Sequence, residues 1–189
     1  MYSGKTKWLI EAIQSSNVTT RLYVHEASAH HVKERGVLRS RSGVEHPVIA
    51  VKDHEQLFDD VKAHMNAGSE YFSVAIDELQ FFDYDIFYKI EEIVSLGNAV
   101  LVAGLDTDFR GLPYGMYVRP SALPALMAVA DQVVKLQAWC AVCGDRATRT
   151  QRLIDGEPAP LDSPLMVPEV LAGGRVTYQA RCRRCHKVF

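Results

Sequence analysis

The chain has 189 residues, of which 48% are hydrophobic, and its 21 basic and 23 acidic side chains give a net charge of −2. This length suits one full-sized domain, or one domain with a small appendix, and the apolar content allows a real core. Basic runs occur at 33–41 and 181–187, but the near-neutral balance provides no global field for nonspecific nucleic-acid binding. There is no run of about 18 apolar residues and no leader peptide pattern. We therefore expect a cytoplasmic protein with no membrane or nucleic-acid partner.

The hydrophobic pattern along the chain predicts helices that alternate with strands. Amphipathic spacing predicts helices, and short apolar runs predict strands. Apolar strands that alternate with helices are typical of an α/β fold with a mostly parallel sheet covered on both faces. The expected helices are 6–16, 54–65 and 84–96, and the expected strands are 20–24, 71–76, 99–103 and, as a further candidate, 130–136.

The composition changes after residue 136. All four cysteines, four prolines between 158 and 168 and the pair Gly173-Gly174 lie beyond this point. We therefore expect two domains, a nucleotide-binding domain at 1–135 and a smaller domain at 136–189.

The first residues are typical of the second half of a phosphate-binding loop. In the complete motif G-x-x-x-x-G-K-[ST], backbone N–H groups surround the phosphates, the lysine reaches the β and γ oxygens, and the hydroxyl holds Mg²⁺. Gly4, Lys5 and Thr6 supply the end of this motif, whereas its leading glycine and the strand before it are absent. By itself, the tripeptide Gly-Lys-Thr is about as often the start of an ordinary helix as it is part of a nucleotide site.

Two carboxylates follow the expected strand 71–76 directly. A strand that ends in Asp77 meets the requirement of the second nucleotide motif, in which the carboxylate faces Mg²⁺ directly or through water. Because neighbouring residues of a strand project to opposite sides, Glu78 is free for another task. We interpret Glu78 as a candidate general base for an acceptor hydroxyl, and the alternative is a solvated helix-cap acid.

Aromatic and charged residues occupy the loops at the expected strand ends. Phe81 and Phe109 are candidates for stacking on a planar ligand, although core aromatics are the default interpretation, as for Phe82 and Tyr114. The alternative to a functional role for Asp106, Asp108 and Arg110 is a set of ion pairs that stabilises the loop.

The four cysteines form two C-x-x-C pairs. Tetrahedral Zn²⁺ takes four thiolates from two such turns. We therefore predict structural zinc, with a loop between the pairs that exceeds the roughly 15–20 residues of a compact ribbon. Redox thiols are the main alternative. The haem signature C-x-x-C-H at 182–186 is discounted because the chain has a second cysteine pair and shows no export signal. The expected ligands are Cys140, Cys143, Cys182 and Cys185.

Together, these motifs resemble those of the type II thymidine kinases over nearly the whole chain. The similar segments are Met1–Thr6, Ile76–Phe82, Gly104–Gly111 with Pro113–Gly115, Thr148–Leu153, and Tyr178 before the second cysteine pair. The resemblance implies a P-loop, RecA-like fold with a C-terminal zinc ribbon and lasso loop. It also implies transfer of the ATP γ-phosphate to the 5′-hydroxyl of thymidine, giving dTMP for pyrimidine deoxynucleoside salvage and DNA synthesis. Mg²⁺ bound with ATP, a homotetramer and feedback inhibition by dTTP are further implications.

The resemblance also assigns roles to residues. It implies that Glu78 is the base and that phosphate and Mg²⁺ are bound by Ser3, Gly4, Lys5, Thr6 and Asp77. It implies a nucleoside pocket made by Met1, Phe81, Leu105, Phe109, Tyr114, Leu171, Ala172, Gly173, Gly174 and Tyr178.

The chain departs from the family pattern in two places. The Gly-Pro that begins the loop is missing, and so is the strand before it. We expect the reading frame upstream of Met1 to encode both, and the chain without them to bind ATP weakly or not at all. The family's Asp-x-Arg-Tyr is not evident in 25–43, so the role of that segment stays open.

Two other classes of function remain alternatives. One is a P-loop ATPase that acts on a macromolecular partner. The other is a non-catalytic zinc-ribbon module on a truncated kinase fold. Its contacts to nucleic-acid phosphates would come from Arg181, Arg183, Arg184 and Lys187.

Overall fold

The centre of the molecule is a parallel sheet of four strands. The computed structural model describes residues 2–33, 36–68, 71–166 and 176–189. The strand order is β5-β1-β6-β7, and every pairing is parallel. The strands are β1 (Thr20–His25), β5 (Ile49–Val51), β6 (Ser73–Asp77) and β7 (Ala99–Val102). The α/β fold expected from the apolar strands is therefore confirmed.

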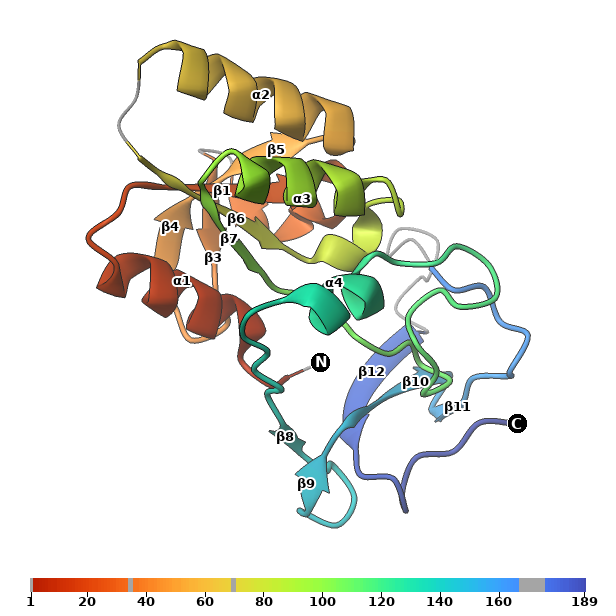
Figure 1. The fold of residues 1–189 in the computed structure, drawn as a ribbon. Helices are drawn as coiled ribbons and strands as arrows, with labels where there is room; N and C mark the ends of the chain where they lie inside the picture. The colour runs from red at the N-terminus through yellow and green to blue at the C-terminus, as the bar shows by residue number, and fades with distance from the viewer. Residues whose placement is uncertain (1, 34–35, 69–70, 167–175) are drawn as a thin grey trace.

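Helices cover both faces of this sheet (Figure 1). They are α1 (Lys5–Ser15), α2 (His54–Asn66), α3 (Ile86–Ser95) and α4 (Leu123–Val129). On one face, α2, α3 and α4 pack around Val74 and Ile76, and on the other face α1 packs against Ala75 between them. This alternation follows from the two-residue period of a strand and explains why β6 is buried throughout and why its residues 74–76 are all apolar.

A second, antiparallel sheet lies on the same side as α1. Its strands are β2 (Val32–Lys33), β3 (Val37–Arg39) and β4 (Glu45–Pro47), which pair in sequence order. Leu38 of β3 joins the core under α1. Two short 3₁₀ helices, η1 (Glu26–His31) and η2 (Leu79–Phe81), follow β1 and β6.

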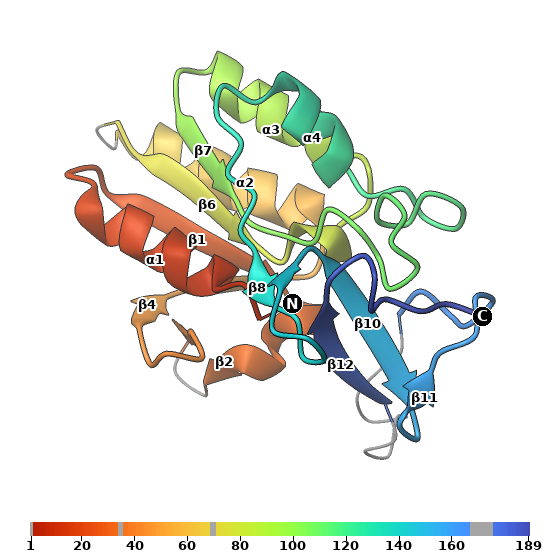
Figure 2. The ribbon, with the colours of Figure 1, turned by 90° about the horizontal axis from the view of Figure 1, so that it is seen from below.

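The C-terminal part contains its own small sheets, which Figure 2 shows beside the central sheet. In one of them β10 lies between β11 and β12, and in the other β8 pairs with β9. The strands are β8 (Ala138–Trp139), β9 (Arg146–Ala147), β10 (Arg149–Ile154), β11 (Glu157–Pro158) and β12 (Val176–Arg181). Cys140 and Cys182 form a small buried cluster with alanines of β8, β9 and β12.

The three expected helices and the first three expected strands are confirmed, with ends that shift by a few residues. The strand expected at 130–136 is wrong, because this segment has no regular secondary structure. A strand needs a hydrogen-bonded neighbour, and a groove of about 550 Å³ separates this segment from β7. Helix α4 was not predicted.

The groove follows the outer edge of β7. Leu101 and Val102 line it on one side, Val133 and Val134 line it on the other, and Ser3 lines it from the phosphate loop. Among the described residues, no strand pairs with this edge of β7. None of the described helices has both the length and the apolar character needed to cross a bilayer.

Candidate active site

The N-terminus of α1 forms the first part of the site. Gly4 precedes the helix with a φ of 79°, a left-handed conformation that glycine adopts without strain. No side chain caps the helix, and its first turn contains no acidic residue. The N–H groups of this turn and the positive end of the helix dipole therefore favour an anion, as expected of Gly4, Lys5 and Thr6.

The hydroxyl of Thr6 joins this helix to the end of β6. Thr6 Oγ1 donates a hydrogen bond of 2.7 Å to Asp77 Oδ2, across 71 positions of sequence. Asp77 is 1% exposed. Burial and the neighbouring Glu78 raise the pKa of Asp77 to about 6, against the opposing effects of the Thr6 hydroxyl, the Glu78 N–H and Lys5. The two nucleotide motifs of the sequence therefore meet in space.

A cavity of about 260 Å³ adjoins this pair. Ser3, Lys5 and Asp77 line it on one side, and Arg39 and Arg41 line it on the other. The guanidinium of Arg41 lies over the Tyr2 ring, 4.1 Å from its centroid, and Arg39 Nε lies 3.5 Å from a Glu45 oxygen. No role was predicted for these two arginines, and the basic run at 33–41 was the only signal for them in the sequence.

Glu78 lies between the phosphate loop and the loop that follows β7. Its backbone is left-handed, with φ 52° and ψ 44°, a conformation rare for residues other than glycine. The carboxylate accepts a short hydrogen bond from Gln80 Nε2, and Gln80 Oε1 accepts one of 3.0 Å from the Leu105 N–H. Glu78 makes no side-chain cap to the following 3₁₀ helix, so the helix-cap alternative is not supported.

The side chains expected in the nucleoside pocket differ in burial. Phe109 and Tyr114 are 3% and 8% exposed, whereas Leu105 and Tyr178 are half-buried. Phe81 is also half-buried and stacks on His25, with 6.5 Å between ring centroids. Phe82 lies in the core, as the default interpretation holds. The other expected pocket residues, Met1, Leu171, Ala172, Gly173 and Gly174, lie outside the described residues.

Tyr114 sits in a tightly packed turn. A Cβ added to Gly115, which has a φ of 73°, would lie 1.8 Å from the Arg119 carbonyl oxygen, so the turn requires glycine at this position. Burial and Tyr178 raise the pKa of Tyr114 to about 12, although Arg152 opposes the shift. The phenol therefore stays protonated and able to donate a hydrogen bond at neutral pH.

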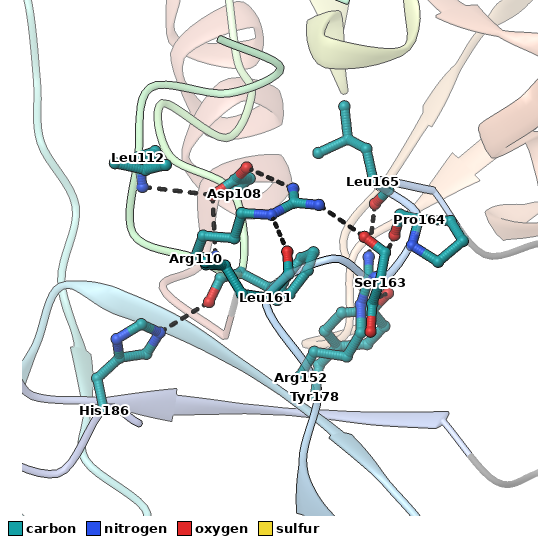
Figure 3. Close-up of polar contacts among 11 residues, drawn as sticks. Asp108, Arg110, Leu112, Arg152, Leu161, Ser163, Pro164, Leu165, Tyr178 and His186 are labelled. Atoms are coloured by element: carbon teal, nitrogen blue, oxygen red, sulfur yellow. Dashed lines mark hydrogen bonds and ion pairs between the residues drawn. The ribbon is translucent and has the colours of Figure 1, made fainter. Parts of the chain in front are cut away.

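Ion pairs stabilise the loop after β7, as the alternative interpretation of its charges held. Arg110 Nη1 lies 3.0 Å from Asp108 Oδ2, while Asp106 pairs with Lys135 at 3.2 Å. Figure 3 shows Arg110 and Arg152 reaching from this loop and from β10 toward the segment 161–165. Arg152 was not predicted as a site residue, and an arginine inside a strand of buried residues was the signal for it.

The four cysteines converge from two tight turns. Their Sγ atoms lie within 4.8 Å of one another, and no disulfide joins them. Gly144 N donates to Cys140 O in the first turn, and Cys185 N donates to Cys182 O in the second. Four convergent thiols without a disulfide fit a tetrahedral metal ion. His186 does not support the haem alternative, because its Nε2 lies 2.8 Å from the Phe109 carbonyl oxygen.

An α/β sheet whose strand-end aspartate meets the hydroxyl of a Gly-Lys-Thr helix start is typical of the P-loop class of nucleotide-binding proteins. The family model for thymidine kinase matches residues 1–186. The chain therefore belongs to the thymidine kinase family, and the resemblance noted in the sequence is confirmed.

Proposed function

We propose that this protein is a thymidine kinase, which transfers the γ-phosphate of ATP to the 5′-hydroxyl of thymidine. One observation carries the proposal. The 2.7 Å hydrogen bond between Thr6 and Asp77 joins the two nucleotide motifs, and the next residue, Glu78, is connected through Gln80 to Leu105 in the loop after β7. A phosphoryl donor and a hydroxyl acceptor thus have adjacent places.

Positioning and charge neutralisation account for most of phosphoryl transfer. The N–H groups at the start of α1 and the ammonium of Lys5 hold the phosphates, together with Ser3 and Gly4. Thr6 and Asp77 would hold Mg²⁺, which would supply charge neutralisation for the transferred phosphoryl group. Arg39 and Arg41 line the adjoining cavity and are the cations available to the distal phosphates.

Glu78 acts as the general base. Its carboxylate takes the proton from the 5′-hydroxyl while that oxygen forms its bond to the γ-phosphorus and the bond to the β–γ bridging oxygen breaks, which leaves ADP. The hydrogen bond from Gln80 holds the carboxylate in place.

Family membership supports the remaining parts of the proposal. We assign the nucleoside pocket to Phe81, Leu105, Phe109, Tyr114 and Tyr178, together with the family positions Met1 and 171–174, which lie outside the described residues. The four cysteines hold one structural zinc ion in the domain 136–189, and the domain 1–135 binds ATP. A homotetramer and feedback inhibition by dTTP complete the proposal.

The test is phosphorylation of a panel of deoxynucleosides with ATP and Mg²⁺, using a version with an apolar strand and Gly-Pro directly ahead of Met1. We expect phosphorylation of thymidine. Glu78→Gln should lower turnover by about 10²–10⁴-fold and leave thymidine affinity in calorimetry unchanged, because a general base acts in the transition state. The control is Glu92→Gln, whose carboxylate pairs with Lys62 on the surface.

Absence of phosphorylation of any pyrimidine deoxynucleoside would exclude the kinase assignment. ATP hydrolysis stimulated by a macromolecule would then favour the ATPase alternative. Oligonucleotide binding that falls steeply with salt would favour the zinc-ribbon module.

A further inference from the structure

Arg152 is a buried cation beside Phe109 and Tyr178, two residues of the proposed nucleoside pocket. It lies in the middle of β10, opposite Tyr178 of β12, and is 3% exposed. A guanidinium stays charged, so burial is tolerated only where its N–H groups have acceptors. Nε donates to the Tyr178 hydroxyl at 3.1 Å, Nη1 to the Pro164 carbonyl and Nη2 to the Leu165 carbonyl, both at 2.5 Å.

Arg110 contacts the same segment, 161–165, at residues that precede Pro164 in the sequence. Its Nε and Nη2 donate to the carbonyls of Leu161 and Ser163, at 2.7 and 2.6 Å (Figure 3). The guanidinium carbons of both arginines lie close to the Phe109 ring centroid, 4.0 Å for Arg152 and 4.4 Å for Arg110. Phe109 and the segment 161–165 are therefore held by the same two side chains.

We infer that Arg152 is a positioning residue for nucleoside binding, which holds Phe109, Tyr178 and the start of the loop in one arrangement. The inference rests on the proposed function. Phe109 and Tyr178 are proposed walls of the pocket, and 161–165 is the chain that leads toward 171–174. One guanidinium is in contact with all three parts, so it sets their relative positions before the nucleoside arrives.

The planar fork of arginine is what this position requires. Three acceptors lie in three directions around the guanidinium while its carbon lies over an aromatic ring. A lysine ammonium is a point charge that cannot reach the three acceptors and stack at once. Arg152→Lys thus keeps the positive charge but removes the combination of three hydrogen bonds and stacking on Phe109.

The experiment is calorimetric binding of thymidine, and separately of ATP, to Arg152→Lys, Arg110→Lys and Tyr178→Phe. Arg152→Lys should weaken thymidine binding by about 10- to 100-fold, the effect expected from loss of charge-assisted hydrogen bonds, and leave ATP affinity within about twofold. Arg110→Lys should produce a smaller loss. Tyr178→Phe should have much less effect in the Arg152→Lys background than alone, because the hydroxyl then has lost its donor.

A second readout separates positioning from folding. Limited proteolysis should cut 161–166 faster in Arg152→Lys, with melting temperature and zinc content near those of the wild type. Arg146→Lys is the matched control, because the Arg146 guanidinium lies over the exposed Trp139 ring, away from the pocket. If Arg152→Lys does not fold, Tyr178→Phe and Arg110→Lys still decide the question.

Unchanged thymidine affinity and unchanged proteolysis in these variants would overturn the inference. A wild-type protein that binds no thymidine would defeat the proposed function instead. In that case, proteolysis of 161–166 still tests whether the two arginines order the segment.

Discussion

The candidate site has two ends that are held together by different groups: the phosphate end, at the start of α1, and the nucleoside end, around Phe109 and Tyr178. At the phosphate end, backbone N–H groups, Lys5 and the exposed Arg39 and Arg41 face the cavity, and the side-chain hydrogen bond from Thr6 to Asp77 joins the two motifs. At the nucleoside end, Arg110 and Arg152 connect the loop after β7 with the segment 161–165. The phosphate end should therefore respond to changes in its backbone support, and the nucleoside end to single side-chain changes.

Loss of the metal tests the nucleoside end most severely. We expect one zinc ion per chain, and Cys182→Ser or chelation should disorder β8–β12 while the central sheet persists. Apparent binding energies of structural zinc are on the order of 10–16 kcal/mol, so little of this part should fold without metal. Metal analysis and hydrogen exchange measure both effects, with zinc-loaded chelator as the control. Protein purified without chelator that holds well under one zinc per chain would contradict the prediction.

Covering the groove beside β7 tests the phosphate end. An apolar strand followed by Gly-Pro, fused directly ahead of Met1, should pair with β7 and bury groove residues such as Leu101 and Val133. Burial of three or four such side chains, at roughly 1.5–3 kcal/mol each, should raise the melting temperature by on the order of 10 °C.

The same fusion should strengthen ATP binding at least about tenfold, because the strand fixes the missing half of the phosphate cradle. A glycine-serine extension of equal length is the control. Equal melting temperatures for the two extensions would show that the groove does not accept a strand.

The pH dependence of stability tests the burial of Asp77. Its pKa is raised from 3.8 to about 6, so the folded state favours the protonated form. Without metal, this contribution to stability is fully present below about pH 4 and is lost as the pH rises through about 6. Urea unfolding should therefore show a steeper loss of stability between about pH 4 and 6 in the wild type than in Asp77→Asn, by a slope equivalent to about one proton.

Binding of Mg²⁺ with nucleotide should strengthen over the same pH interval, because the metal requires the carboxylate. Asp59→Asn, on the exposed face of α2, is the control for general charge effects. A pH profile of unfolding that is identical in Asp77→Asn and wild type would rule out this account.

Arg41 gives the smallest expected effect. The residue is exposed beside the phosphate cavity, so Arg41→Ala should raise the KM for ATP by only about two- to fivefold and leave the KM for thymidine unchanged. The measurement is steady-state kinetics of the version with the complete loop. Arg183→Ala, an exposed arginine of the second basic run, is the control. An equal effect of both variants would mean that only net charge matters.

Local patterns predicted three of the four strands of the central sheet, β1, β6 and β7, whereas β5 was not predicted. The apolar run 74–76 lies in a strand, as expected where a parallel sheet is covered on both faces, and Asp77 follows from its place at the strand end. The spacing of the two cysteine pairs likewise predicted that four thiols converge, because two tight turns can share one metal.

The remaining features depend on partners that are distant in the sequence. The segment 130–136 has strand-like composition but no neighbour to pair with, so propensity alone failed there. Arg152 became recognisable only when β10 brought it beside Phe109, Tyr178 and the carbonyls of 164 and 165. Arg39 and Arg41 reach the phosphate cavity because β3 packs over α1, and no local motif announces that contact.

The left-handed backbone of Glu78 has a consequence for attempts to stabilise the protein. A residue with a side chain at a φ of 52° raises the free energy of the folded state by on the order of 1 kcal/mol or more, and glycine at the same place would relieve it. A library selected only for heat resistance should therefore enrich glycine or asparagine at position 78. The selected variants would be more stable but would lack the proposed base. Selection for stability at this position therefore needs an activity screen alongside the thermal one.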